Sequence, residues 1–251
     1  MLVYVWNGTA DETLSHPFDP FPCGTAEQPF VIAQLGQSLD GRIATPTGDS
    51  KYINGGAALD HLHAIRARVD AVLVGIGTVV ADDPLLTVRR VPGRSPARVI
   101  LDPSGRLPCD ARVLADDGVP RIVITRPGAP VAQGADCIAI EADGGVIPPR
   151  AILRALGACG FRRILVEGGA RTISAFMDAG LVDRLHVLVA PLILGSGRNG
   201  LDLAPIGPLS QALRPRARAH LLADGNVLFD CDLSAGRLPS EPLSALAPWE
   251  A

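Results

Sequence analysis

Short apolar runs alternate with turn residues and amphipathic stretches along most of the chain. Runs of about 4–8 apolar residues that are bounded by glycine, proline or aspartate are typical of strands buried in a parallel sheet. The pattern therefore predicts strands at residues 30–36, 71–74, 97–101, 121–125, 135–140, 162–166, 184–190 and 226–232.

The stretches between these runs carry the spacing of helices. Proline at the start and glycine after the end bound a predicted helix at 149–159, and another is expected at 172–179. A short helical turn is expected at 78–81. The helix predicted over 57–68 is amphipathic, and its expected apolar side consists of Leu59, Leu62, Ile65 and Val69.

Two histidines, His61 and His63, fall on this first helix. Because they are two positions apart, they point to different faces and cannot form a metal-binding pair. We expect both to lie at the surface or to cap the helix.

The alternation of strands and helices as far as residue 190 predicts the fold class. It indicates a three-layer α/β fold, a mostly parallel sheet with helices on both faces. The last strand can pair with residues 217–222 through the turn Asp224-Gly225, which adds an antiparallel C-terminal edge.

The two ends of the chain differ from this pattern. Residues 1–28 are expected to form an irregular N-terminal extension, because HPFDPFPCG at 16–24 is too rich in proline for regular structure. Met1–Trp6 could form a strand. The extension could pack across the domain or reach a partner subunit, and we favour the first. Residues 29–233 are predicted to form one domain, and residues 234–251 a loose tail.

Composition narrows the functional class. The formal charge of −3 and the absence of a basic block argue against a nucleic-acid partner. The five cysteines are scattered and unpaired in spacing, which is typical of reduced thiols in the cytoplasm. No apolar run is long enough to span a bilayer, and no secretory signal is evident. We therefore expect a cytoplasmic protein without a membrane partner.

Two predicted junctions between a strand and a helix contain glycines, at Gly75-x-Gly77 and at Gly168-Gly169. Glycines at such places let main-chain N–H groups at a helix start face a phosphate. Neither junction is a complete G-x-G-x-x-G, because Val80 occupies the third position of the first. Together they favour a nucleotide or another phosphorylated ligand.

Charged residues accompany these junctions. Arg89 suits a phosphate, and carboxylates can orient a heterocycle or supply a proton. Asp83, next to Pro84, is interpreted as a turn residue. Arg66 is either an exposed helix charge or a neighbour of Arg89. No zinc-binding set, Walker A sequence or G-x-S-x-G elbow is present, so no metal is expected.

Several motifs share one order and spacing: SLDG at 38–41, GDS at 48–50, RA at 66–67, GTVVADDPLLTVR at 77–89 and VEGG at 166–169. Over residues 29–232 this set resembles the reductase domain of the riboflavin-biosynthesis deaminase-reductases. The deaminase half is not seen, so the resemblance is to a stand-alone reductase. It implies a dihydrofolate-reductase-like fold, a homodimer and NADPH. The implied reaction passes hydride to C1′ of an opened sugar imine, which turns the ribosyl group of a phosphorylated ribosylaminopyrimidine into ribityl.

The resemblance also assigns roles by position. By their charge and placement, and not through the resemblance, Asp82 and Glu167 are candidates to assist proton delivery. The substrate would be held, with its phosphate at the arginines and the serine, by Gln34, Ser50, Arg66, Leu86, Arg89 and Glu167. The cofactor would be lined by Gly36, Tyr52, Thr78, Asp82, Gly169, Ala170, Arg171 and Thr172, and onward to Ala175. Candidates for its 2′-phosphate are Ser104 and Arg126, each just past a strand.

Two departures from the family pattern leave alternatives open. Gln34 stands where the family often has a lysine, and Tyr52 where it has a tryptophan. Loss of a cation near the base could indicate a related reductase that acts on a pterin or another heterocyclic imine. A non-catalytic nucleotide-binding homologue is the remaining alternative.

Overall fold

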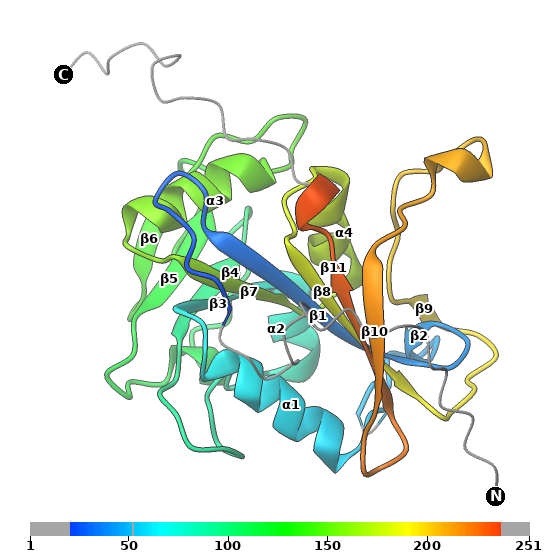
Figure 1. The fold of residues 1–251 in the computed structure, drawn as a ribbon. Helices are drawn as coiled ribbons and strands as arrows, with labels where there is room; N and C mark the ends of the chain where they lie inside the picture. The colour runs from blue at the N-terminus through cyan, green and yellow to red at the C-terminus, as the bar shows by residue number, and fades with distance from the viewer. Residues whose placement is uncertain (1–20, 52, 237–251) are drawn as a thin grey trace, which may run out of the picture.

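A computed structural model describes residues 21–51 and 53–236 of the chain (Figure 1). Its main sheet has nine strands in the order β10-β11-β8-β1-β7-β3-β4-β5-β6. The strands are β1 (Phe30–Ser38), β2 (Arg42–Ala44), β3 (Ala71–Gly75), β4 (Ala97–Leu101), β5 (Arg121–Thr125), β6 (Asp136–Ala139), β7 (Arg163–Glu167), β8 (Arg184–Ala190), β9 (Arg198–Asn199), β10 (Arg216–Leu221) and β11 (Val227–Asp232). The helices are α1 (Gly56–Arg66), α2 (Ile76–Asp82), α3 (Pro149–Ala158) and α4 (Ala170–Asp178), with short 3-10 turns η1 (Arg112–Leu114), η2 (Leu209–Gln211) and η3 (Ser234–Gly236).

The pairing of strands confirms the predicted fold class. Strands β1, β3, β4, β5, β6, β7 and β8 pair in parallel, whereas β11 pairs antiparallel with both β8 and β10. Helices α1 and α2 cover one face of the sheet, and α3 and α4 cover the other (Figure 1). A separate apolar cluster fills each interface, so the molecule has three layers.

Local boundaries follow the sequence with small shifts. Helix α3 begins at Pro149 as predicted, whereas α2 begins at Ile76, directly after β3, and α4 begins at Ala170. The sequence pattern predicts neither β2 nor β9, which pair antiparallel with each other. Both strands are too short to show a hydrophobic period.

The buried side of α1 differs from the prediction. Leu59 is 39% exposed, whereas His61 and His63 are 1% and 3% exposed, so the expectation of surface or capping histidines is wrong. His61 is buried because the sheet presents polar side chains beneath this helix, whereas His63 is buried against the loop after α2. His61 Nε2 lies 3.0 Å from His186 Nδ1, and His186 Nε2 lies 3.2 Å from Asp230 Oδ1.

Ordered contacts reach upstream of the predicted domain start at residue 29. Phe21 is 2% exposed and stacks on Phe30, with ring centroids 6.2 Å apart. The guanidinium of Arg184 lies 5.9 Å from the centre of the Phe21 ring. The predicted packing of the extension across the domain is thus seen at Phe21. Met1–Trp6, the rest of 1–20 and the tail from 237 lie outside the described residues.

Two further findings concern the cysteines and the helices. All five cysteines lie in the described part and are free thiols. Among the described residues, no helix combines the length and the apolar character that a membrane crossing requires.

Both buried histidines have lowered pKa values. Burial, followed by the neighbouring His186, lowers the pKa of His61 from 6.5 to about 3. Burial, followed by Arg66, Arg89 and Arg90, lowers the pKa of His63 from 6.5 to about 4. Below about pH 6.5 the two histidines bind protons in the unfolded chain but stay neutral in the folded chain. The stability of the fold is therefore retained above about pH 6.5 and is lost as the pH falls toward the pKa values of the folded state.

We therefore expect the free energy of unfolding to fall between pH 7 and pH 5.5 by up to about 1 kcal/mol per pH unit for each histidine. Urea unfolding at a series of pH values measures it. A free energy of unfolding that is constant over this range would contradict the buried, neutral state of both rings.

Candidate active site

The predicted site residues gather at the carboxyl ends of the central strands. Strand β7 lies between β1 and β3, and its last residue, Glu167, is in register with Gln34 of β1 and Val74 of β3. These side chains face α1 and α2, because Ile32 and Leu165, two residues earlier on β1 and β7, pack in the cluster beneath those helices. The carboxyl end of a parallel sheet is where ligands bind in open α/β folds.

A buried ion pair forms the floor of this site. Arg66 Nε donates to Glu167 Oε1 over 2.7 Å, and Arg66 Nη2 donates to Glu167 Oε2 over 2.6 Å. Both residues are buried, so the interpretation of Arg66 as an exposed helix charge is wrong. Burial opposes the charge of Arg66, but the carboxylate outweighs it and raises the pKa of the guanidinium. The pair is a bidentate contact between α1 and β7.

The loop after α2 rests on α1. Asp83 has φ 41° and Leu86 has φ 56°, a left-handed conformation that is uncommon for residues with a side chain. Asp83 is the C-cap of α2 and its Oδ1 accepts from Arg112 N, which confirms the predicted turn role. Arg66 Nη1 donates to Thr87 O over 3.2 Å, which ties the loop to the ion pair.

Arg89 closes this loop as an accessible cation. Its main-chain N–H donates to His63 Nδ1 over 2.9 Å, and its Nη1 donates to Thr87 Oγ1 over 2.7 Å. Within the described residues, no carboxylate forms a salt bridge with Arg89. Partial burial, followed by the charges of Arg66 and Arg112, lowers the pKa of Arg89. An anion would relieve this repulsion.

The two glycine junctions lie next to each other in the structure. Gly169 N donates to Thr78 Oγ1 over 2.9 Å, which joins the start of α4 to α2. A β-carbon at Gly168, where φ is +89°, would lie 2.6 Å from Thr78 Oγ1, and one at Gly75 would lie 2.5 Å from Thr172 Oγ1. The glycines allow this close approach of the two helix starts.

Of the remaining cofactor candidates, Asp82 and Arg171 lie on the two helices of this junction. Ser50 Oγ donates to Asp82 Oδ1 over 3.3 Å, so the loop after β2 reaches α2. Gly36 lies against Asn54, whose side chain would overlap a β-carbon there. Tyr52 lies outside the described residues. Arg171 is exposed at the start of α4.

The proposed 2′-phosphate candidates lie further along the same edge. Arg126 Nε donates to Pro103 O over 2.8 Å, which brings this arginine beside Ser104. Both side chains are exposed at the ends of β5 and β4, and β3 separates β4 from β7.

The SLDG motif has a structural role. Asp40 accepts from Ser38 Oγ and from the N–H groups of Leu194 and Gly195, so it joins the β1–β2 turn to the loop after β8. The hydrogen bond from Ser38, followed by that from Leu194, lowers the pKa of Asp40 to about 2.

His63 is the site residue that the sequence prediction missed. It lies three positions before Arg66, and the spacing of three places both side chains on one face of α1. The spacing from Arg66 was the one feature of the sequence that indicated this position. The alanines around His63 gave no reason to expect that its ring would be buried and would accept a hydrogen bond.

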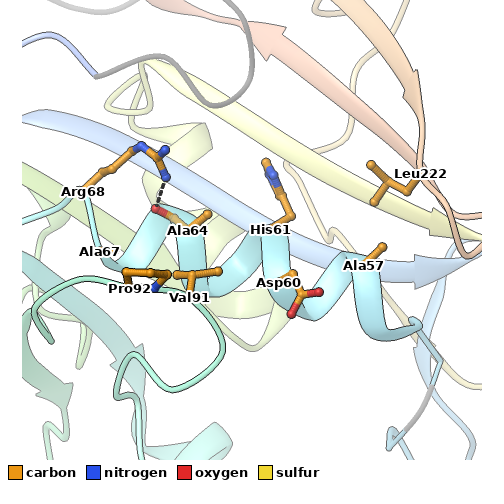
Figure 2. A pocket seen from close by; sticks show the side chains of 9 residues that line it. All are labelled: Ala57, Asp60, His61, Ala64, Ala67, Arg68, Val91, Pro92 and Leu222. Carbon is orange, nitrogen blue, oxygen red and sulfur yellow. Dashed lines mark hydrogen bonds between the residues drawn. The ribbon is translucent and has the colours of Figure 1, made fainter.

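The other flank of α1 carries a groove of about 530 Å³. Figure 2 shows its lining, which consists of Ala57, Asp60, His61, Ala64, Ala67, Arg68, Val91, Pro92 and Leu222. It contains none of the predicted site residues. The candidate site is therefore the strand-end cluster and not this groove.

The buried ion pair should matter for stability. We expect Arg66→Ala to lower the free energy of unfolding by about 3–5 kcal/mol, because it leaves the Glu167 carboxylate buried without its partner. Arg90→Ala is the matched control, since Arg90 also bonds a carboxylate over 2.6 Å but at the surface, and it should cost less than about 1 kcal/mol. Chemical denaturation measures both, and equal losses would contradict the assigned role.

Comparison with known proteins identifies relatives of this chain. The chain is 36% identical over 218 residues to the riboflavin biosynthesis protein RibD of Aquifex aeolicus, covering 84% of this chain and 60% of that protein. It is 36% identical over 196 residues to the 2,5-diamino-6-ribosylamino-4(3H)-pyrimidinone 5′-phosphate reductase of Methanothermobacter thermautotrophicus, covering 74% of this chain and 90% of that protein.

Solved structures give the same result. A diaminohydroxyphosphoribosylaminopyrimidine deaminase/5-amino-6-(5-phosphoribosylamino)uracil reductase from Thermotoga maritima superposes with a TM-score of 0.71 at 31% identity. The match covers 82% of this chain and 57% of that one, so the chain spans less than two thirds of its RibD relatives. The family described as the RibD C-terminal domain matches residues 29–216. The chain belongs to the RibD C-terminal domain family.

Proposed function

We propose that this protein is an NADPH-dependent reductase that converts the ribosyl group of a phosphorylated ribosylaminopyrimidine into ribityl. One observation carries the proposal: Glu167, the ion-pair partner of Arg66, is followed directly by the glycines of the α2–α4 junction. A substrate site at Arg89 and a cofactor site at the junction would thus share one wall. The relative from Methanothermobacter, whose name specifies a pyrimidinone phosphate reductase, supports the choice of substrate.

The residues at the junction fit a dinucleotide. The N-cap of α4 is Gly169, which has no side chain to cap the first turn. Thr78 and Thr172 add hydroxyl groups, and a β-carbon at Gly77 would meet no atom of the described protein. Main-chain N–H groups and hydroxyls are the donors that suit a diphosphate.

We assign the cofactor to this junction. Its diphosphate would lie at Gly169–Thr172, with Thr78 beside it and Ser104 and Arg126 available for a 2′-phosphate. Asp82 would line the cofactor away from the diphosphate. When bound, the cofactor supplies the hydride. The protein aligns the sugar carbon and excludes water.

The substrate residues divide by chemistry. Arg89 and Ser50 are assigned to the phosphate, because Arg89 has a charge that no described carboxylate neutralises. Gln34, in register with Glu167, is assigned to the heterocycle, since an amide both donates and accepts. Leu86 is 2% exposed and supports the loop from beneath.

The two carboxylates have different surroundings. Both Glu167 oxygens accept from Arg66, which keeps this carboxylate an acceptor for N–H groups of the heterocycle. Asp82 is exposed and bonded to Ser50, so we assign the delivery of a solvent proton to the imine nitrogen to Asp82. We extend the family expectation of a homodimer in the cytoplasm to this chain as part of the proposal.

Gln34 favours a second candidate function. A neutral amide in place of a lysine changes the recognition of a base carbonyl, so a pterin or another heterocyclic imine remains a candidate substrate.

Purified protein with NADPH and the phosphoribosylaminopyrimidine should show a substrate-dependent loss of the absorbance of the reduced nicotinamide. A panel that includes dihydropterins separates the two candidates. Turnover of a pterin alone would replace the proposed substrate, and turnover of no panel member would refute the proposed activity.

Arg89→Ala should weaken substrate binding by about 1.5–3 kcal/mol through the lost phosphate contact, with NADPH affinity unchanged. The control is Arg94→Ala, an exposed arginine a few residues along the same segment. Substrate KM and a cofactor titration measure the two effects. Equal losses for both ligands would contradict the division of the site.

Gln34→Lys tests the heterocycle contact. If the site binds a pyrimidine, the added cation should preserve or raise kcat/KM for that substrate relative to the pterins on the panel. A shift of the ratio toward pterins would favour the second candidate.

A further inference from the structure

We propose that His63 is a positioning residue that gives the site its preference for a phosphorylated substrate, by holding the main chain of Arg89. The inference rests on the proposed function, because it takes Arg89 as the phosphate-binding residue. It assigns a role to a side chain that no step of the proposed reaction uses directly.

The contact itself is specific. His63 is 3% exposed, and its Nδ1 accepts the main-chain N–H of Arg89 over 2.9 Å. The two residues are far apart in sequence, and one belongs to α1 while the other belongs to the loop after α2. The bond fixes the position of the Arg89 backbone and not that of its guanidinium, which donates to Thr87 Oγ1. The guanidinium therefore keeps donors available for an anion.

The loop needs such an anchor. Asp83 and Leu86 both have positive φ, and neither is glycine, so contacts elsewhere must hold the loop in this conformation. Helix α1 supplies two of them, from His63 to Arg89 N and from Arg66 to Thr87 O. The two side chains are three residues apart on one face of α1. One helix thus fixes both Glu167 and the phosphate arginine.

The surroundings of the ring keep it an acceptor. Burial disfavours a proton on His63, and so do Arg66, Arg89 and Arg90. The carboxylate of Asp60 opposes them, but it is bonded to Arg90 over 2.6 Å. Only a ring with an unprotonated Nδ1 can accept from Arg89 N. His63 is therefore neutral, and its Nδ1 is available as an acceptor beside Arg66, Arg89 and Arg90.

The test uses variants that separate the acceptor from the ring. Asn has an oxygen at about the position of Nδ1, whereas Leu has no acceptor and Gln extends its acceptor beyond that position. His63→Asn should retain the contact, and His63→Leu and His63→Gln should lose it. His61→Leu is the matched control, because His61 is equally buried on the same helix but contacts His186.

Steady-state kinetics with the phosphorylated substrate and with its dephosphorylated form provide the first readout. His63→Leu should raise KM for the phosphorylated form about 10-fold, because a main-chain donor loses its partner, while kcat changes little. His63→Gln should behave similarly, which keeps the test open if the Leu variant does not fold. His63→Asn should stay within about threefold of wild type, and KM for the dephosphorylated form should not change in any variant.

A second readout needs no turnover. The affinity of each full-length variant for ribose 5-phosphate, measured by calorimetry, should follow the same order. If the wild-type protein binds ribose 5-phosphate but reduces nothing, the proposed function fails while the role of His63 is still tested. An Asn variant as weak as Leu, or an equal loss in His61→Leu, would overturn the inference, as would an equal loss for the dephosphorylated substrate.

Discussion

The bidentate contact between Arg66 and Glu167 is the interaction on which the rest of the site depends. It joins the last turn of α1 to the end of β7, at the point where β7 continues into the glycines that start α4. Arg66 also holds the loop that carries Arg89 through Thr87 O. Because removing either partner would leave a buried charge, the position of α1 against the sheet is strongly constrained.

This constraint also accounts for the polar side chains on one face of the sheet. The polar row beneath α1 includes Gln34, Glu167 and His186 in consecutive strands, in place of the apolar side chains that fill the rest of that face. Helix α1 pairs Arg66 with Glu167 and His61 with His186. The cost of burying these polar groups is offset where each one has a hydrogen-bond or ion-pair partner. The contacts between α1 and the polar row therefore fix the position of the helix on the sheet.

Most of the fold could be predicted from the sequence, because the strands β3, β4, β5 and β7 are buried on both faces and read as continuous apolar runs. The glycine junctions and the ADDP turn could also be predicted, because neighbouring glycine, aspartate and proline residues indicate them. The buried face of α1 was not, since its histidines pack on polar partners that are far away in sequence. For the same reason, Arg66 could not be told from a surface charge. The pairing of β2 with β9 could not be predicted either, because both strands are too short to show an alternation of apolar and polar residues.

The most direct test of this account is a crystal structure with NADPH and a phosphorylated substrate analogue. The account predicts the cofactor diphosphate at the first turn of α4, the substrate phosphate at Arg89, and the heterocycle between Gln34 and Glu167. A cofactor or substrate bound instead in the groove beside Ala64 and Arg68, or a cofactor phosphate at Arg89, would contradict the proposed arrangement of the two ligands.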